Sequence, residues 1–217
     1  PKRNFPSRQQ NFYPGSYGLT DSSVQLGAKH SVRFSVLIYP TLLCLNEQSI
    51  LDYGRYGIAL NARGGVVLRA DRITVTSTDT VELHRWYRVE GLVKASGAMS
   101  LTLARADGSQ PPSKVRSHAK SALNLGQTAQ ITVAARLTNY SINNYFNGKI
   151  GLLQINADDH TLALWDFSKD ISSMTVPGQD CPDLNLVNAP TRAVTGALWD
   201  ATEMNWRHKP DHYAAIA

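Results

Sequence analysis

The sequence predicts an all-β protein, built as an antiparallel jelly roll or sandwich of two sheets. Three observations lead to this fold class. Short runs rich in β-branched and aromatic residues recur along the chain, apolar and polar residues alternate within them, and turn-forming Gly, Pro, Asn and Asp separate them. Turn signals about every 8–12 residues indicate about ten to thirteen short strands and almost no credible helix. Two sheets would then pack face to face around a shared apolar core.

The first half of the chain supplies the clearest strands. In 32–39, every second side chain is apolar, which predicts a half-buried strand. Pro40 ends this strand because proline cannot donate a hydrogen bond to a sheet. Gly64 and Gly65 form the turn of a hairpin. The other strands that we expect in this half are 48–53, 56–61, 66–70 and 72–76.

The middle of the chain continues the pattern with a tryptophan near the start of a strand. In 83–94, Trp86 lies on one face of the expected strand. The opposite face carries Tyr87, Val89, Gly91 and Val93. A further strand is expected at 99–105. The segment 113–126 is polar, with Ala and Leu near helical spacing, and we interpret it as a loop.

The stretch Tyr145–Asn156 is the centre of the predicted fold. Asn147-Gly148 is interpreted as a tight turn, because both residues tolerate positive φ. After this turn, Ile150 and Leu152 point to one side and further apolar residues point to the other side. Apolar residues on both faces predict a strand that is covered on both faces.

Strands at 130–137 and 161–166 flank this central stretch, with a polar loop at 140–144 and a turn at Asp158-Asp159. The core that we expect between the two sheets can be read from the inward positions of all these strands. It consists of Phe34, Val36, Trp86, Leu101, Ile131, Val133, Ile150 and Leu152.

The two ends of the chain differ from its middle. Residues 1–23 are punctuated by Pro and Gly without periodicity, and we interpret them as an irregular N-terminal arm. Residues 24–174 form the predicted sandwich. Residues 175–217 show little periodicity and are interpreted as an extended connector towards a further domain. The sequence starts at Pro1 rather than Met and lacks a polar tail, so we expect an excerpt of a longer polypeptide.

Composition excludes several classes of function. The chain has 217 residues, of which 42% are hydrophobic and 18% charged, as in soluble globular proteins. The net charge of +5 is scattered, whereas nucleic-acid binding needs a basic stripe, so we expect no nucleic-acid partner. No apolar run approaches the roughly 20 residues of a membrane span. Cys44 and Cys181 lie far apart in the sequence, and neither has a second Cys nearby that would indicate a metal site. A reducing cytoplasm is the simpler interpretation, although a disulfide between the two residues is possible.

No set of residues in the sequence is interpreted as catalytic. His208 and His212 have the i, i+4 spacing of a metal pair, but Pro210 argues against a helix there, and His208 has no neighbouring Glu. The Gly-x-Ser-x-Gly motif of serine hydrolases is absent from the sequence. The remaining carboxylates do not follow the single-strand pattern of the sugar hydrolases built on this kind of sandwich. These carboxylates are Glu82, Glu90, Asp166 and Glu203.

We predict no metal site, but calcium binding at one turn is an alternative that the sequence leaves undecided. Asp158, Asp159 and His160 could form a metal turn, but paired carboxylates at a hairpin more often serve only to solvate it. Asp52, Asp71 and Asp79 are equivalent candidates.

Exposed aromatic residues are the candidates for binding sugars or partners. The positions at strand ends or loops, where a lectin would place aromatic rings, are Tyr53, Tyr56, Tyr140 and Tyr145. Tyrosine at the corner of a sandwich is also commonly structural. The candidates for contacts with a partner are Trp199, Trp206, His208 and Tyr213.

Several motifs follow one another in an order that resembles a known fold family. These are Trp-Tyr-Arg-Val-Glu-Gly at 86–91, Met-Ser-Leu-Thr-Leu at 99–103, Ile-Thr-Val at 131–133 and Phe-Asn-Gly-Lys-Ile-Gly at 146–151. Over about residues 24–166 the sequence is similar to the concanavalin A-like, laminin-G-like jelly rolls, and the resemblance implies that fold. It says little about function, because the same sandwich occurs in lectins, hydrolases and plain spacers.

The flanking segments resemble the large (β) subunit of the N,N-dimethylformamidase family. The matching residues are 15–17 before the sandwich, and 186–196, 206–208 and 213–216 after it. The family consists of bacterial amidohydrolases with large and small subunits, which hydrolyse N,N-dimethylformamide to dimethylamine and formate. Its iron site has Tyr and Glu ligands in another region of the large subunit. No stretch here matches that region, so no ligand is transferred and no cofactor is expected in this chain.

The resemblance therefore implies a non-catalytic jelly-roll domain of a large subunit. Its partners would be the catalytic domain of the same polypeptide, the small subunit and other large subunits of an oligomer, in the bacterial cytoplasm. The alternative, from another functional class, is a lectin-like module that binds carbohydrate.

Overall fold

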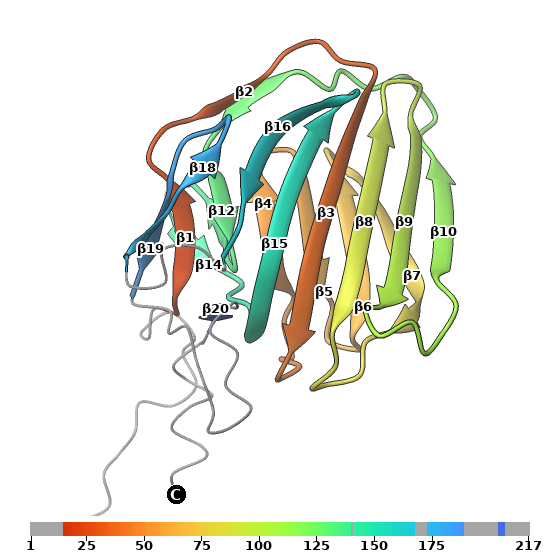
Figure 1. The fold of residues 1–217 in the computed structure, drawn as a ribbon. Helices are drawn as coiled ribbons and strands as arrows, with labels where there is room; N and C mark the ends of the chain where they lie inside the picture. The colour runs from red at the N-terminus through yellow and green to blue at the C-terminus, as the bar shows by residue number, and fades with distance from the viewer. Residues whose placement is uncertain (1–14, 140, 168–172, 189–203, 207–217) are drawn as a thin grey trace, which may run out of the picture.

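A computed structural model describes residues 15–139, 141–167, 173–188 and 204–206. Within these residues the regular structure consists of antiparallel strands, without a helix, in two large sheets that lie face to face (Figure 1). The described part of the chain thus contains no helix that is long and apolar enough to cross a membrane. The predicted two-sheet antiparallel sandwich is confirmed.

The first sheet has the strand order β17-β19-β1-β12-β4-β5-β6-β7. The strands β4 to β7 follow one another as hairpins, whereas the other half of the sheet joins segments that are far apart in the sequence. The bounds in this order are Thr175–Val176, Leu184–Val187, Tyr17–Thr20, Ile131–Val133, Gln48–Tyr53, Tyr56–Leu60, Gly65–Ala70 and Ile73–Thr80.

The second sheet has the order β10-β9-β8-β3-β15-β16-β18, and β20 also pairs with β15. The bounds are Ser113–His118, Ala98–Arg105, Tyr87–Lys94, Ser31–Pro40, Gly148–Ala157, His160–Trp165, Gly178–Gln179 and, for β20, Met204–Trp206. Two small pairs complete the fold. They join β2 (Val24–Leu26) to β11 (Gln127–Ala129), and β13 (Arg136–Thr138) to β14 (Ser141–Asn143).

The core lies between the two sheets and is filled by alternate side chains of each strand. On β3, the inward side chains of Val32, Phe34, Val36 and Ile38 are all buried. They face buried residues of the first sheet, and the rings of Phe34 and Tyr56 are 5.7 Å apart between centroids. Most of the predicted core is confirmed, because Phe34, Val36, Leu101, Ile131, Val133 and Ile150 are buried.

Two predicted core residues lie outside the core. Trp86 is only half-buried, and the core position at this end of β8 belongs to Tyr87. Leu152 is 45% exposed, whereas Leu153 is fully buried. The cause is a β-bulge between Ile150 and Leu153 in the pairing of β15 with β3, which shifts the alternation of inward and outward residues by one position. The prediction that Ile150 and Leu152 share a face was therefore wrong.

Asn147-Gly148 is not the tight turn that the sequence predicted. Gly148 begins β15 and pairs with Pro40 of β3, and the Asn147 amide N donates to Gln48 Oε1 at 2.9 Å. Gly148 has a φ of 153°, and a Cβ there would collide with the carbonyl oxygen of Tyr39. Glycine is needed at this position because two backbones approach each other closely.

Strands also occur where the sequence predicted irregular structure. The predicted loops at 113–126 and 140–144 contain β10 and β14, the predicted arm contains β1, and the predicted connector contains β17, β18, β19 and β20. The predicted strand 130–137 is interrupted at Ala134, which has a φ of 62°. These strands are short or polar, and they are stabilised by pairing with distant segments, as β1 is by β19. A local pattern cannot report such pairing.

Candidate functional site

Two of the four tyrosines predicted to bind sugar are core residues. Tyr53 and Tyr56 are 0% and 2% exposed, and their rings pack against each other. Their hydroxyl groups donate to the carbonyl oxygens of Val24 at 2.9 Å and Leu125 at 2.7 Å. Burial raises the pKa of Tyr56 to about 12 and raises that of Tyr53 further. The prediction that these two rings could stack on a sugar is therefore corrected.

The other aromatic candidates are only partly described. Tyr145 is half-buried, its hydroxyl donates to the Ile142 carbonyl oxygen at 3.3 Å, and its ring lies 6.3 Å from that of Tyr17, so it has structural contacts. Trp206 belongs to β20, where its backbone pairs with Gly148. The candidates that lie outside the described residues are Tyr140, Trp199, His208 and Tyr213.

Asp52 is a buried carboxylate on β4, and its partners are cations of the protein itself. It forms an ion pair with Arg69 of β6, and Arg136 Nε of β13 lies 3.8 Å from its Oδ1. Burial raises the pKa of Asp52, and the two guanidinium groups only partly oppose this shift. Among the residues that the structure describes, no three His, Cys, Asp or Glu side chains come together as a possible metal site.

Asp158 holds the turn between β15 and β16 against the start of β3, and the predicted turn at Asp158-Asp159 is confirmed. Its Oδ1 accepts hydrogen bonds from the backbone N–H groups of Ser31, at 2.8 Å, and His30, at 3.0 Å. Desolvation raises the pKa of this carboxyl, but the hydrogen bonds from Ser31 and His30, together with the electrostatic attraction of His30 and Lys29, lower the pKa overall. Asp158 thus has a structural role. Cys44 and Cys181 do not form a disulfide with each other.

Aromatic side chains gather on the outer face of the second sheet, at the end where β3 stops and β8 begins. The Tyr39 ring lies 5.2 Å from that of Trp86 and 6.1 Å from that of His84 between centroids. Lys149 Nζ lies 5.2 Å from the Tyr39 centroid, a cation–π distance. Tyr39, His84, Trp86 and Lys149 are called the aromatic cluster below. The sequence reasoning missed it because it assigned Trp86 to the core.

The opposite part of the same outer face carries a pocket of about 590 Å³ between β8, β9 and β10. Leu92 and Lys94 line it from β8, and Lys114 and Arg116 line it from β10. Between them, β9 contributes the small side chain of Ser100, paired with Leu92 on one side and with Arg116 on the other. A small residue between two strands with long side chains leaves the surface hollow. The pocket lined by Leu92, Lys94, Ser100, Lys114 and Arg116 is called the cationic pocket below.

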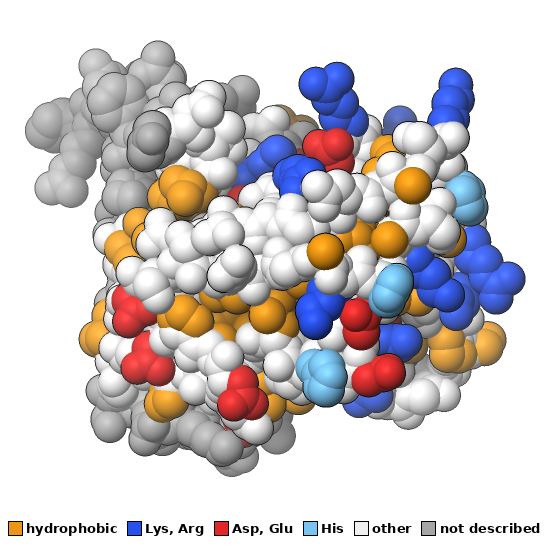
Figure 2. All heavy atoms as spheres, turned by 90° about the horizontal axis from the view of Figure 1, so that it is seen from above, with side chains coloured by type: hydrophobic (Ala, Val, Ile, Leu, Met, Phe, Trp, Pro, Cys, Tyr) orange, Lys and Arg blue, Asp and Glu red, His pale blue; other side chains and the backbone are white. Residues whose placement is uncertain are grey.

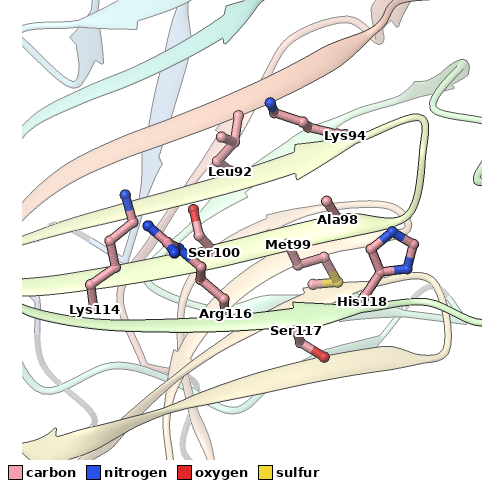
Figure 3. A pocket seen from close by; sticks show the side chains of 9 residues that line it. All are labelled: Leu92, Lys94, Ala98, Met99, Ser100, Lys114, Arg116, Ser117 and His118. Carbon is pink, nitrogen blue, oxygen red and sulfur yellow. The ribbon is translucent and has the colours of Figure 1, made fainter.

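The figures show how the cationic side chains lie. In Figure 3, Lys114 and Arg116 extend from their strand towards Ser100, whereas Met99 and Ser117 point to the other side of the sheet. Figure 2, the view from above, shows Lys and Arg side chains gathering at the right, the side on which β8, β9 and β10 lie in Figure 1. The sequence analysis missed this pocket because its positive charges come from two strands, β8 and β10, which are separated by β9.

No protein-family model matches the chain, and no curated protein matches its sequence. The structure is similar to a putative carbohydrate binding protein from Bacteroides ovatus, with a TM-score of 0.53 and 10% identity over 84% of this chain and 62% of that protein. A SAP-like pentraxin from Limulus polyphemus has a TM-score of 0.49 and 12% identity, over 67% of this chain and 70% of that chain. The LG1-3 region of the laminin alpha2 chain has a TM-score of 0.49 and 14% identity, over 66% of this chain and 31% of that chain.

The chain thus spans less than two thirds of the Bacteroides ovatus protein. At such low identity, structural likeness concerns the fold and not the activity. Together, the two antiparallel sheets and this likeness show a two-sheet antiparallel jelly-roll sandwich.

Proposed function

We propose that this chain is a non-catalytic jelly-roll domain whose task is to bind other parts of a protein assembly. The observation that carries the proposal is the pairing of β1 with β19, in which Tyr17 lies opposite Val187. Asn188 Nδ2 also donates to the Gly15 carbonyl oxygen at 2.8 Å. Strands from the first and the last part of the described chain therefore lie side by side in the first sheet, as suits a domain carried within a longer chain.

The parent protein that we propose is the large subunit of an N,N-dimethylformamidase-like amidohydrolase. The support is the sequence resemblance of the flanking segments, chiefly 186–196 and 206–208. The apolar filling of the core between the two sheets is consistent with chemistry carried out elsewhere in such a subunit. The iron and its ligands would then lie in the catalytic domain, and the assembly would work in the bacterial cytoplasm.

The aromatic cluster is the surface that we propose for contact with the rest of the large subunit. Strand β20 pairs with β15 at this end, and Asn205 lies opposite Lys149 of the cluster. The chain after the sandwich thus returns to the surface that carries Tyr39 and Trp86. Partly exposed aromatic rings are enriched at protein interfaces because they bury a large apolar area.

The test compares the complete large subunit with this chain alone. Co-expressed with its small subunit and supplied with iron, the complete large subunit should release dimethylamine from N,N-dimethylformamide, and the 217-residue chain with iron should release none. Hydrolysis by the chain alone would disprove the non-catalytic role. A complete large subunit without amide hydrolase activity would disprove the proposed parent.

A variant of the complete large subunit tests the docking surface. Trp86→Ala should loosen the sandwich from its neighbouring domain and speed limited proteolysis between them. Met174→Ala is the matched control, because Met174 is also apolar and 51% exposed but lies beside the first sheet. Equal proteolysis rates in both variants would exclude the aromatic cluster as the contact.

The second candidate function is a lectin-like module, favoured by the neighbouring rings of Tyr39 and Trp86, which are tilted relative to each other and both partly exposed. The structural likeness to a putative carbohydrate binding protein is compatible with this function. In a glycan-array screen, reproducible binding that Trp86→Ala abolishes would favour the lectin. Binding to no glycan would exclude it.

A further inference from the structure

The cationic pocket contains more positive charge than the surrounding residues balance. Lys94, Lys114 and Arg116 are exposed, and among the residues that the structure describes they form no ion pair. Glu90 of β8 is opposite Thr102 of β9, which is opposite Lys114. Glu90 is therefore two strands from Lys114, roughly 9–10 Å between backbones. The pocket therefore carries an excess of positive charge, which a bound anion would neutralise.

The hydrogen-bond donors around the pocket differ in kind and come from three strands. Arg116 offers a planar fork of N–H groups, Lys94 and Lys114 offer ammonium groups from opposite sides, and Ser100 offers a hydroxyl between them. In Figure 3, Lys114 and Arg116 reach towards Ser100, and Lys94 lies on the other side of Leu92. Donors placed on several sides of a pocket suit an anion with three or more oxygens. A carboxylate has two oxygens in one plane, and a single Arg would satisfy it.

We propose that the cationic pocket binds a small organic phosphate or sulfate monoester. The oxyanion would lie over Ser100 between Arg116 and the two lysines, and the organic part would lie against Leu92 and Ala98. The volume of about 590 Å³ is within the usual range of small-molecule pockets and much larger than a lone oxyanion requires. This inference is independent of the proposed amidohydrolase parent.

A nucleic acid fits the pocket less well. Single-stranded nucleic acid is bound along an extended basic groove with aromatic rings on which bases stack. The residues that line the pocket include no aromatic side chain other than the imidazole of His118. A pocket lined by three cations and by no ring on which a base could stack matches a compact anion better than a nucleic-acid strand.

The experiment is a calorimetric titration of the 217-residue chain with four probes. Phenyl phosphate and phenyl sulfate carry the proposed oxyanions, benzoate carries a planar carboxylate, and benzyl alcohol is uncharged. We expect one-to-one binding of at least one ester, at least about tenfold tighter than benzoate, and no binding of benzyl alcohol. The two esters, compared with each other, distinguish phosphate from sulfate. Absence of saturable ester binding, or benzoate binding as tight as the ester, would overturn the proposal.

Four variants test the geometry rather than the overall charge. Arg116→Gln should weaken ester binding about tenfold or more, and Arg116→Lys, which keeps the charge but loses the fork, should cause an intermediate loss. Ser100→Ala should weaken binding about two- to tenfold without any change of charge. Arg88→Gln is the matched control, because Arg88 is exposed on β8 of the same sheet but does not line the pocket.

All the substituted side chains lie on the outer face, so the variants should keep the wild-type circular dichroism spectrum and melting temperature. An equal loss in Arg88→Gln and Arg116→Gln would overturn the proposal, because it would mean diffuse attraction by the surface. Tighter binding of a pentaglutamate peptide or a short oligonucleotide than of either ester would overturn it as well, and would assign the pocket to a macromolecule.

Discussion

The outer faces of the two sheets differ in how much of them is covered. On the first sheet, every residue of β4 and β5 is buried, so these strands are covered on both faces. On the second sheet, β8 and β9 alternate between buried and more exposed residues, so one face is open. The open face carries both the aromatic cluster and the cationic pocket. A sandwich with one open face offers partners a surface that leaves its core undisturbed.

The cover over β4 comes from the chain between β12 and β15. Arg136 of β13 reaches Asp52, Ser49 N donates to the Asn144 carbonyl oxygen at 2.7 Å, and Asn147 N donates to Gln48 Oε1. The polar groups of Asp52, Ser49 and Gln48 on this covered face therefore find partners within the protein. On the open face, among described residues, the cations of the pocket have no such partners.

The largest expected effects come from truncating apolar side chains to Ala. These variants test directly whether the first sheet is covered on both faces and the second sheet on only one. On β4, the neighbours Ile50 and Leu51 are both fully buried, so Ile50→Ala and Leu51→Ala should each lower the free energy of unfolding by about 2–5 kcal/mol. On β15, Leu153→Ala should lower the free energy of unfolding by a similar amount, whereas Leu152→Ala should change it by no more than about 0.5 kcal/mol. Urea denaturation measures all four. A similar loss for Leu152 and Leu153 would mean that the bulge is misplaced or that this face is covered.

A smaller effect is expected from the ion pair on the covered face. Arg69→Met leaves Asp52 buried beside only Arg136, and should lower the free energy of unfolding by about 2–3 kcal/mol at neutral pH. Burial raises the pKa of Asp52, so its ionised form is the costly one, and the loss should shrink as the pH falls and Asp52 binds a proton. Urea denaturation at neutral and mildly acidic pH checks this.

The matched control for that ion pair is Arg88→Met on the open face, where Arg88 is exposed. It should change the free energy of unfolding by less than about 0.5 kcal/mol at either pH. A pH-independent loss in Arg69→Met would show that the variant removes packing of the Arg69 stem and not the partner of a buried charge.

The smallest effect concerns Asp158, whose pKa shifts in the opposite direction to that of Asp52. Because hydrogen bonds from Ser31 and His30 lower the folded-state pKa, Asp158 stabilises the fold fully above its ordinary pKa. This contribution is lost as the pH falls through the lowered value. Thermal melts from roughly pH 6 to pH 2 should therefore show a weaker pH dependence for Asp158→Asn than for wild type. Parallel pH profiles would contradict the structural role of this carboxylate.

Much of the fold could be predicted from local patterns, and little of the candidate site could. The strand Gln48–Tyr53 was predicted with its observed bounds, because Gly54 closes it. The strands 32–39 and 56–61 lie within one residue of theirs, because their alternation is uninterrupted. The predicted orientation of residues 150–153 was wrong, because a bulge moves Leu152 to the surface and no local sequence pattern indicates that bulge. Tyr53 and Tyr56 were misassigned because their cover, around Val24 and Leu125, comes from distant segments.

The amino-acid sequence by itself determined that this chain forms antiparallel strands around an apolar core, because period-two patterning and turn residues act over a few neighbours. Only the tertiary structure decided which face of each strand stays in water. Covering a face depends on segments that are far apart in the sequence, as Gln48 and Asn147 are, which are 99 residues apart. For the same reason, the aromatic cluster and the cationic pocket could be found only after the strands had been placed side by side.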